Sequence, residues 1–457
     1  LEQLKGCAEL ARWERMAERS AKKITSRTNL DVETAISDAK YGFIAGALQE
    51  TYTEGDKNAN IKTRRIDRLV ANKWLGFPIF ITLMLLMFTA VYKVGAYPQA
   101  WIESAFTLMG GFFADIIPEG AVQDLVVNGI IGGVGSVAVF LPNILILYLF
   151  ISLMEDSGYM ARAAFIMDRL MHRMGLHGKS FIPMLMGFGC NVPAIMATRT
   201  IESHSSRLIT ILITPFMSCS ARLPVYILLA GTFFPRYAPL VMIGLYIFGI
   251  LIAALTARLL RIVKYHKDET PFVMELPPYR WPTLRSTLRH MWEKCEQYIK
   301  KIGTIVLAAT VIIWFLSYFP RPAENIPADG SAYAESYIGM MGKAIEPLVE
   351  PLGLNWRSSI ALIASIPAKE LVVSTLGVLY NSDEKNLSQS LIASGDFTKS
   401  SAAAFLVFIL LFFPCIATIA TIAEETGKKK FALFAIIYNT GVAWLIAFLI
   451  NQFGSYL

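Results

Sequence analysis

Long runs of apolar residues alternate with short polar segments from about residue 75 to residue 450. A bilayer crossing needs about 20 predominantly apolar residues, and several of these runs reach or approach that length. The pattern therefore predicts an all-α, polytopic helical membrane protein. The predicted crossings lie at 75–94, 125–153, 210–229, 240–260, 302–319, 402–422 and 431–450, and the second of them is expected to be interrupted at Leu141-Pro142.

Residues 1–73 show a different pattern, in which apolar positions three and four apart are separated by charged ones. This spacing predicts amphipathic helices at 9–23 and 31–51, followed by a basic segment at 61–73. We predict a small cytoplasmic helical domain at 1–73. Because the chain begins inside a charged helical pattern and shows no signal peptide, we interpret it as a fragment whose upstream part has been removed.

The composition agrees with the apolar pattern. Hydrophobic residues make up 54% of the chain and charged residues 17%, whereas soluble proteins average about 45–50% and ~25%. The net charge of +7 does not indicate a nucleic-acid partner, because the cytoplasmic loops of membrane proteins collect Lys and Arg. The five cysteines are too few and too scattered for a disulfide framework.

The distribution of charge among the loops predicts the orientation of the crossings. Residues 258–301 carry ten Lys or Arg against five Asp or Glu, whereas residues 320–355 carry two against five. The positive-inside bias places the first segment and the N-terminus in the cytoplasm, and the second segment outside. Within the first segment, 283–301 is predicted to form an amphipathic helix on the inner surface.

Two apolar segments, 181–198 and 359–380, fit these charges only if each enters and leaves the membrane from one side. Each is followed by two crossings, and the two sets have opposite orientations. Opposed repeats with broken helices are typical of secondary transporters. The alternative is a set of ordinary crossings with an irregular charge bias. The predicted division is 74–264 for the first crossing and first repeat, 265–301 for the cytoplasmic loop and its amphipathic helix, and 302–457 for the second repeat.

Three cysteines lie where glycine or proline interrupts an apolar segment: Cys190, Cys219 and Cys415. Non-helical backbone at membrane depth persists only where it lines a cavity or is buried in protein. Thiolates bind late first-row cations, although cysteine also packs as a small hydrophobe. Four prolines mark the same segments, namely Pro193, Pro215, Pro367 and Pro414.

Acidic groups supply the remaining candidates. Glu370 lies in an apolar segment, where a carboxyl group is expensive and usually functional. We predict a cation ligand or coupling residue, and the alternative is an ion pair with neighbouring Lys369. Near the end of an earlier crossing, four residues are candidates for a gate or a relay to a cytoplasmic partner, and the alternative is a solvated helix start with internal ion pairs. They are Glu155, Asp156, Tyr159 and Arg162.

Nothing in the sequence indicates an enzyme. Residues 175–180 (GLHGKS) end like a phosphate loop, but the first glycine of that motif is replaced by Arg173 and no strand precedes it. The histidines lack the spacing of a zinc hydrolase, which also argues against a membrane-embedded hydrolase. We therefore predict that this chain has no nucleotide site.

Several motifs resemble the FeoB family of bacterial ferrous iron transporters, and together they extend the resemblance over 66–453. The longest are 153–165 (LMEDSGYMARAAF) and 187–199 (GFGCNVPAIMATR). The others are 215–219 (PFMSC), 274–280 (MELPPYR), 367–370 (PAKE) and 414–415 (PC). One departure is Ser220, where glycine is common in the family.

The resemblance implies two inverted gate-type repeats that carry Fe²⁺ into the cytoplasm across the bacterial inner membrane, with Cys190, Cys219, Cys415 and Glu370 along the pathway. It also implies that residues 1–73 are the end of a helical linker that follows a GTP-binding domain absent from this chain, where GTP and Mg²⁺ would bind. Small cytoplasmic Feo proteins and the lipid bilayer are the expected partners. Whether the chain assembles into a homo-oligomer is not decided by the resemblance. The alternative is a carrier of another solute, such as a nucleoside or another divalent metal, on a gate-type scaffold.

Overall fold

The computed structural model describes residues 10–28, 32–51, 63, 66–70, 72, 75–118, 120–263, 279–320, 335–380, 382 and 386–454. It separates into two compact units, Leu1–Arg64 and Arg65–Leu457. The first contains α1 (Leu10–Thr28) and α2 (Val32–Thr51), which correspond to the two predicted helices. Residues 61–62, 64–65, 71 and 73 of the predicted basic segment at 61–73, and the motif positions 274–278, lie outside the described residues.

Every described element of the second unit is helical, as the apolar pattern predicted. Five segments are long and apolar enough to cross a membrane, and a sixth is a pair of helices bent by 85°. The prediction of an all-α, multi-pass membrane protein is therefore confirmed. The unbroken spans are α4 (Gly76–Ile116), α12 (Ala238–Val263) and α21 (Lys429–Gly454), and the broken ones are His204–Phe233 and Lys399–Thr426.

The remaining elements complete the chain. Before the first broken span come α5 (Ala121–Asp124), the π-helix η2 (Leu125–Ile131), α6 (Gly132–Asp156), α7 (Tyr159–Arg173), η3 (Gly178–Ser180), α8 (Phe181–Gly187), α9 (Asn191–Ala197) and η4 (Thr198–Thr200). The later ones are α13 (Leu284–Tyr318), α15 (Tyr337–Val349), η7 (Glu350–Leu352), α16 (Trp356–Ala364), α17 (Leu371–Leu379) and α18 (Leu387–Ser394).

Two helices are longer than the sequence predicted. The first crossing was expected to end near Val94, but α4 continues to Ile116 because α6 packs closely along it. A Cβ atom on Gly95 would meet the side chain of Asn143, and the Asn143 amide donates a hydrogen bond to Gln99 over 3.0 Å. The predicted surface helix at 283–301 and the crossing at 302–319 likewise form one helix, α13, whose apolar part is only Leu307–Tyr318.

The interruption expected at Pro142 is absent, because α6 passes through this proline as a continuous helix. The chain bends instead after Asp156, at Gly158. This glycine has a φ of 80°, a left-handed conformation that side chains with a Cβ rarely adopt. The bend of 85° separates α6 from α7.

The two broken spans have the same plan. In the first, α10 (His204–Ile213) and η5 (Thr214–Phe216) lead to a break at 217–219, followed by η6 (Ser220–Arg222) and α11 (Leu223–Phe233). In the second, α19 (Lys399–Leu411) leads to a break at 412–415, followed by α20 (Ile416–Thr426). A pair of short helices precedes each span, α8 and α9 in the first half and α16 and α17 in the second.

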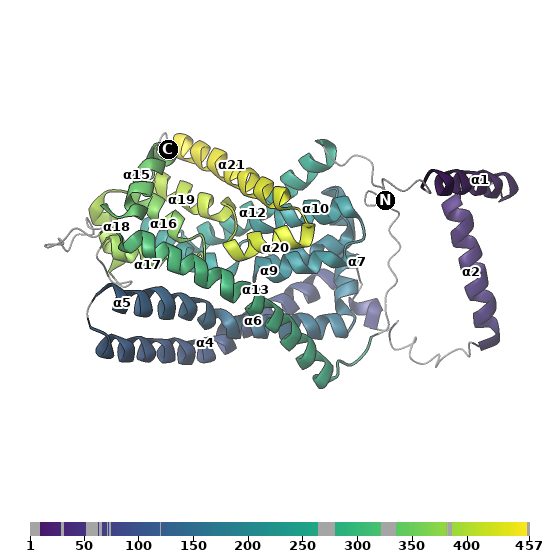
Figure 1. Cartoon of the computed structure of the whole chain (residues 1–457), viewed down its shortest axis with the longest axis horizontal. Coiled ribbons are helices and arrows are strands. Elements are labelled where there is room, and N and C mark those ends of the chain that lie inside the picture. Colours follow the sequence, from purple (N-terminus) through teal and green to yellow (C-terminus); the bar gives the residue numbers. More distant parts are fainter. Residues whose placement is uncertain are drawn as a thin grey trace. The chain divides into compact units, whose positions relative to one another are not determined.

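The two halves run in opposite directions. Arg207 near the start of α10 contacts Glu425 near the end of α20, and Ser400 at the start of α19 donates a hydrogen bond to the backbone of Asn451 near the end of α21. We call these the Glu425 end and the Asn451 end of the bundle. In Figure 1, α7 and α10 lie toward the first and α15, α16 and α18 toward the second. The inverted arrangement predicted from the loop charges is thus visible in the helix directions.

Candidate functional site

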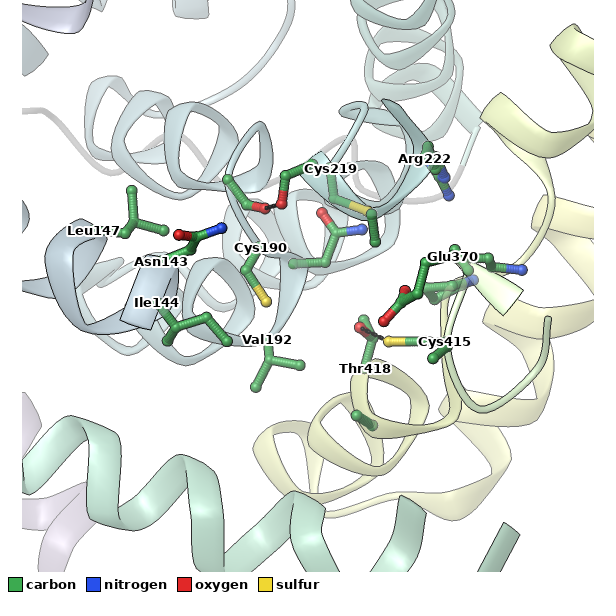
Figure 2. Close-up of a pocket in the computed structure, with 18 of the residues that line it drawn as sticks. Asn143, Ile144, Leu147, Cys190, Val192, Cys219, Arg222, Glu370, Cys415 and Thr418 are labelled. Carbon is green, nitrogen blue, oxygen red and sulfur yellow. Dashed lines mark hydrogen bonds between the residues drawn. The ribbon is translucent and has the colours of Figure 1, made fainter. Parts of the chain in front are cut away.

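The breaks of both halves meet at one cavity of about 110 Å³, which we call the cysteine cavity. All four predicted metal ligands line it: Cys190, Cys219, Glu370 and Cys415. Figure 2 shows Cys190 and Cys219 on one side, and Glu370 and Cys415 on the other. Residues far apart in the sequence are therefore brought to one place by the inverted arrangement.

Each of these four residues stands immediately before the start of a helix. Cys190 precedes α9, Cys219 precedes η6, Glu370 precedes α17 and Cys415 precedes α20. The amino end of a helix carries partial positive charge and favours an anionic group beside it. Burial opposes ionisation of a group that lacks a counter-charge. A cation in the cavity would supply that counter-charge.

The same backbone hydrogen bond joins the two breaks of each half. In the first half the amide of Ser220 donates to the carbonyl of Gly189 over 3.2 Å, and in the second the amide of Ile416 donates to the carbonyl of Ile366 over 2.9 Å. The Ser220 hydroxyl adds a second bond to Gly189, of 3.0 Å. The breaks are therefore positioned by backbone contacts that do not depend on the cysteine side chains.

The four predicted prolines occupy different positions. Pro367 and Pro414 lie in breaks of the second half and line the cavity. Pro215 lies in η5, and its carbonyl accepts a hydrogen bond from Arg222 over 3.0 Å. Pro193 is the third residue of α9 and lies inside the helix, not at the break. The helix α9 tolerates it there because the first turn has no carbonyl partners for its amides.

Arg222 is a functional candidate that the sequence analysis did not select. Its side chain is fully buried, and it donates to the carbonyls of Pro215 at 3.0 Å and Met217 at 3.4 Å in its own half. It also reaches the carbonyl of Phe412 across the junction, at 3.4 Å. The guanidinium therefore satisfies carbonyls freed by both broken spans. The sequence did contain one signal for this role, because Arg222 is a single arginine next to a break in an apolar segment.

Lys369 does not pair with Glu370, so the ion-pair alternative is not what the structure contains. The buried Lys369 ammonium lies 4.5 Å from the ring centre of Phe412 and 5.1 Å from that of Phe413, which are cation–π distances. Its Nζ has no hydrogen-bond partner among the described residues. The cavity wall therefore carries the positive groups Lys369 and Arg222 beside a single carboxyl group.

Two amide oxygens at the cavity were also missed by the sequence analysis. Asn143 and Asn191 both line it, and the Oδ1 atom of each is buried without a hydrogen-bond partner among the described residues. An unpaired buried carbonyl oxygen costs free energy, and it is a ligand that divalent cations accept. The thiols and these oxygens do not yet form a coordination sphere, because no three His, Cys, Asp or Glu residues in the described chain are close enough to hold one ion.

The predicted gate or relay residues lie away from the cavity, at the bend between α6 and α7. Arg162 is fully buried, and it forms an ion pair with Asp67 at 3.0 Å and donates to the carbonyl of Gly158 at 2.9 Å. Its guanidinium also lies 4.2 Å from the ring centre of Tyr279.

The other three candidates at this bend differ in their contacts and in their exposure to solvent. Asp156 accepts a hydrogen bond from Thr287 at 3.1 Å. Glu155 is exposed, whereas Tyr159 is buried. The bend therefore joins α7 to the segment that precedes the first crossing and to the loop that precedes α13.

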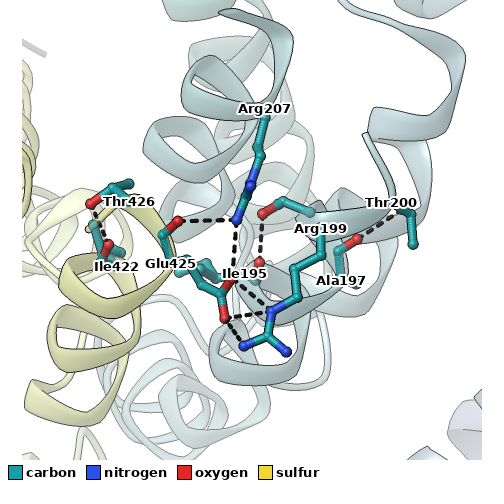
Figure 3. A network of polar contacts seen from close by, with 9 residues as sticks. Ile195, Ala197, Arg199, Thr200, Arg207, Ile422, Glu425 and Thr426 are labelled. Carbon is teal, nitrogen blue, oxygen red and sulfur yellow. Dashed lines mark hydrogen bonds and ion pairs between the residues drawn. The ribbon is translucent and has the colours of Figure 1, made fainter. Parts of the chain in front are cut away.

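A buried carboxylate joins the two halves at the Glu425 end (Figure 3). Glu425 is 3% exposed and accepts from Arg199 over 2.8 Å and from Arg207 over 3.1 Å. The hydrogen bond and the charge of Glu425 raise the pKa of Arg199. Arg199 lies just after α9 of the first half, and Glu425 lies near the end of α20 in the second half. This contact therefore joins the two halves.

Two family models match the chain. One, described as "Nucleoside recognition" and named Gate, matches residues 137–233 and 299–429. The other, described as "Ferrous iron transport protein B C terminus", matches residues 242–294. The cysteine cavity lies almost entirely within the Gate match.

Curated relatives cover most of the chain. A protein of Porphyromonas gingivalis named "Fe(2+) transport protein A/Fe(2+) transporter FeoB fusion protein" is 50% identical over 93% of this chain and 55% of its own length. The "Fe(2+) transporter FeoB" of Campylobacter jejuni is 41% identical over 89% and 68%, and that of Methanocaldococcus jannaschii is 39% identical over 93% and 64%. The chain thus spans between about half and two thirds of these relatives. No solved structure matches it.

Proposed function

The chain belongs to the FeoB family, and from this premise we propose that it forms the membrane pathway through which ferrous iron enters the bacterial cytoplasm. The observation that carries the proposal is the set of groups at the cysteine cavity. Three thiols and one carboxyl group, each at the start of a helix, face one cavity at the junction of two inverted halves. Thiolate and carboxylate groups together suit a borderline cation such as Fe²⁺.

Transport would proceed by exchange of ligands at this junction. Fe²⁺ would leave its water for the thiols of the first half, the thiol and carboxyl group of the second, and the amide oxygens of Asn143 and Asn191. Because no three acidic or thiol groups among the described residues are close enough to hold one ion, binding would require the two halves to approach each other. Rocking of one half against the other would then open the cavity to the opposite side.

The charged groups support an orientation for this cycle. Lys428, Lys429 and Lys430 lie three to five residues after Glu425, and Arg199 and Arg207 lie at the same end. From the positive-inside bias we propose that the protein lies in the inner membrane, with the Glu425 end and the N-terminus facing the cytoplasm.

Partners follow from the same orientation. We propose that an upstream GTP-binding domain, holding GTP and Mg²⁺, acts on the bend between α6 and α7 through the ion pair of Asp67 with Arg162. A small Feo protein is a further proposed partner, supported by the relative whose printed name joins Fe(2+) transport protein A to FeoB. Assembly of several copies stays a prediction.

Nucleoside transport is a second candidate, because the Gate model carries the description "Nucleoside recognition". The size of the cysteine cavity disfavours binding of a nucleoside at that cavity. A cavity of about 110 Å³ is smaller than the roughly 300–1,000 Å³ of pockets for drug-sized ligands. Binding of a radiolabelled nucleoside that Cys190→Ser leaves unchanged would support this candidate over iron transport.

Uptake of Fe²⁺ into vesicles tests the proposal, with the full-length protein that contains this chain. We expect Cys190→Ser and Glu370→Gln each to lower the uptake rate at least tenfold, since each removes a group from a transient coordination sphere. The matched control is Cys295→Ser, because Cys295 is buried in α13 and does not line the cavity. Unchanged uptake in both cavity variants would remove the site assignment and leave the family intact.

A further inference from the structure

A second and larger cavity, of about 560 Å³, adjoins the cysteine cavity on the side of α15 and α16. We call it the Asp124 cavity. Pro367 lines both cavities, and after it Glu370 faces the cysteine cavity whereas Leu371 faces the Asp124 cavity. The break between α16 and α17 is therefore a wall that the two cavities share.

Asp124 is the one acidic residue among those that line this cavity, and no lining residue is basic. Its carboxylate is held at both oxygens. The indole nitrogen of Trp314 donates to Oδ2 over 2.7 Å, and the amide of Asn128 donates to Oδ1 over 2.6 Å. A carboxylate offers about four acceptor positions, so each oxygen keeps one for water or a cation. Hydroxyl groups extend the polar lining, at Thr310, Ser317, Ser374 and Thr375.

The local backbone favours this arrangement. The π-helix Leu125–Ile131 follows Asp124 directly, and π-turns occur frequently at functional sites. Gly129 of this segment lies against Trp314, where an added Cβ would approach the indole Cγ to 3.1 Å. A glycine at this position lets α13 bring the indole close enough to orient the carboxylate.

We propose that the Asp124 cavity is a vestibule that collects a hydrated divalent cation at Asp124 and delivers it to the cysteine cavity through the break between α16 and α17. This inference rests on the proposed function. The larger volume, about 560 Å³ against about 110 Å³, suits an ion that keeps its water. Carboxylate and hydroxyl oxygens suit harder ions such as Mn²⁺, whereas the thiols beyond the wall suit softer ones.

Binding of Mn²⁺ to the purified protein, followed by electron paramagnetic resonance, tests the site directly. We expect Asp124→Asn to weaken binding about tenfold, because the ion loses one nearby charge. Trp314→Phe keeps the charge and removes the orienting donor, so a smaller loss is expected. The matched control is Asp115→Asn, which removes the same charge from an exposed position at the end of α4. Equal affinities for Asp124→Asn and the wild type would overturn the proposal, as would an equal loss in Asp115→Asn.

Uptake of Fe²⁺ into vesicles separates this inference from the proposed function. We expect Asp124→Asn to raise the half-saturating Fe²⁺ concentration about tenfold with little change in the maximal rate, because the coordinating groups of the cysteine cavity are intact. Unchanged half-saturation with normal uptake would overturn the vestibule alone. If the wild type takes up no Fe²⁺ while Mn²⁺ binding still depends on Asp124, the proposed function fails and the cation site stands.

Discussion

The two halves of the bundle share a backbone plan and differ in chemistry. Each joins its two breaks by one backbone hydrogen bond, from Ser220 to Gly189 in the first half and from Ile416 to Ile366 in the second. The first half brings two thiols and the guanidinium of Arg222 to the cavity. The second brings one thiol, a carboxyl group and a buried lysine. Backbone geometry is thus repeated in the two halves, and the side chains diverge at the cysteine cavity.

The comparison also shows how the halves are fastened to each other. Arg222 of the first half reaches Phe412 of the second at the centre of the bundle, and Glu425 of the second half binds Arg199 and Arg207 of the first at one end. Both contacts place a charged group of one half against polar groups of the other. Substitutions at these contacts therefore test whether the halves act as separate units.

The largest effect is expected for Arg222→Met. The change leaves the carbonyls of Pro215, Met217 and Phe412 without their buried donor, and each unsatisfied group costs about 1–3 kcal/mol. We expect the free energy of unfolding to fall by about 3–5 kcal/mol, the usual cost of removing one partner of a buried charged contact. Thermal unfolding in detergent measures it. Arg236→Met, at an exposed position after α11, is the control, and equal melting temperatures would contradict the prediction.

A smaller effect is expected for Glu425→Gln at the Glu425 end. Two arginines lose a carboxylate that is 3% exposed, and hydrogen bonds to charged groups contribute about 1.5–3 kcal/mol each. We expect faster labelling of Cys415 by a thiol reagent, because the two halves separate more readily. Glu202→Gln breaks an exposed pair with Lys179 and should leave labelling unchanged. A labelling rate in Glu425→Gln equal to that of the wild type would show that this contact does not hold the halves together.

Lys369→Met tests the difference in charge between the two walls. Lys369 is the buried basic group beside Phe412 and Phe413, and its protonated form repels a cation in the cavity. The substitution removes that repulsion. We expect divalent-ion affinity to rise about tenfold, measured by competition with a metal-binding dye. Lys343→Met, at an exposed position, is the control. A loss of affinity in Lys369→Met would instead mean that the lysine supports the ligands.

The smallest effect is expected for Ser220→Ala, which makes the two halves more alike. The hydroxyl bond to Gly189 is lost and the backbone bond between the same residues stays. One hydrogen bond contributes about 0.5–1.5 kcal/mol, so the melting temperature should fall only slightly. Ile416→Pro removes the corresponding amide in the second half and should cost more. A larger loss in Ser220→Ala than in Ile416→Pro would contradict the shared plan.

The sequence predicted the helical class, the inverted order of the halves and the four residues that line the cavity. The helical class and the inverted order are confirmed, because charge in the loops and apolar runs are local signals. The four residues line one cavity, and their role as ligands stays a prediction. The interruption at Pro142 was wrong, since a proline in a long helix is tolerated when neighbouring helices pack around it. The end of the first crossing was also wrong, because α4 continues to Ile116 along α6, a contact between segments that are distant in sequence.

Other features of the site depend on contacts that no local pattern contains. Arg222 acts on carbonyls of two distant segments, and the contact of Glu425 with Arg207 joins residues 218 positions apart. Each of the four candidate ligands stands one residue before a helix starts. This shared position depends on the exact residue at which each break ends. Sequence reasoning locates a break more coarsely than that.

The backbone bonds between paired breaks have a mechanical consequence. When one broken span shifts, the bond from Ser220 to Gly189, or from Ile416 to Ile366, carries the neighbouring re-entrant helices with it. We therefore expect each half to move as a single rigid body, with relative motion at the seam between the two halves. An ion bound at that seam would contact both halves at once. Ion binding and the relative motion of the halves would therefore be coupled through very few atoms.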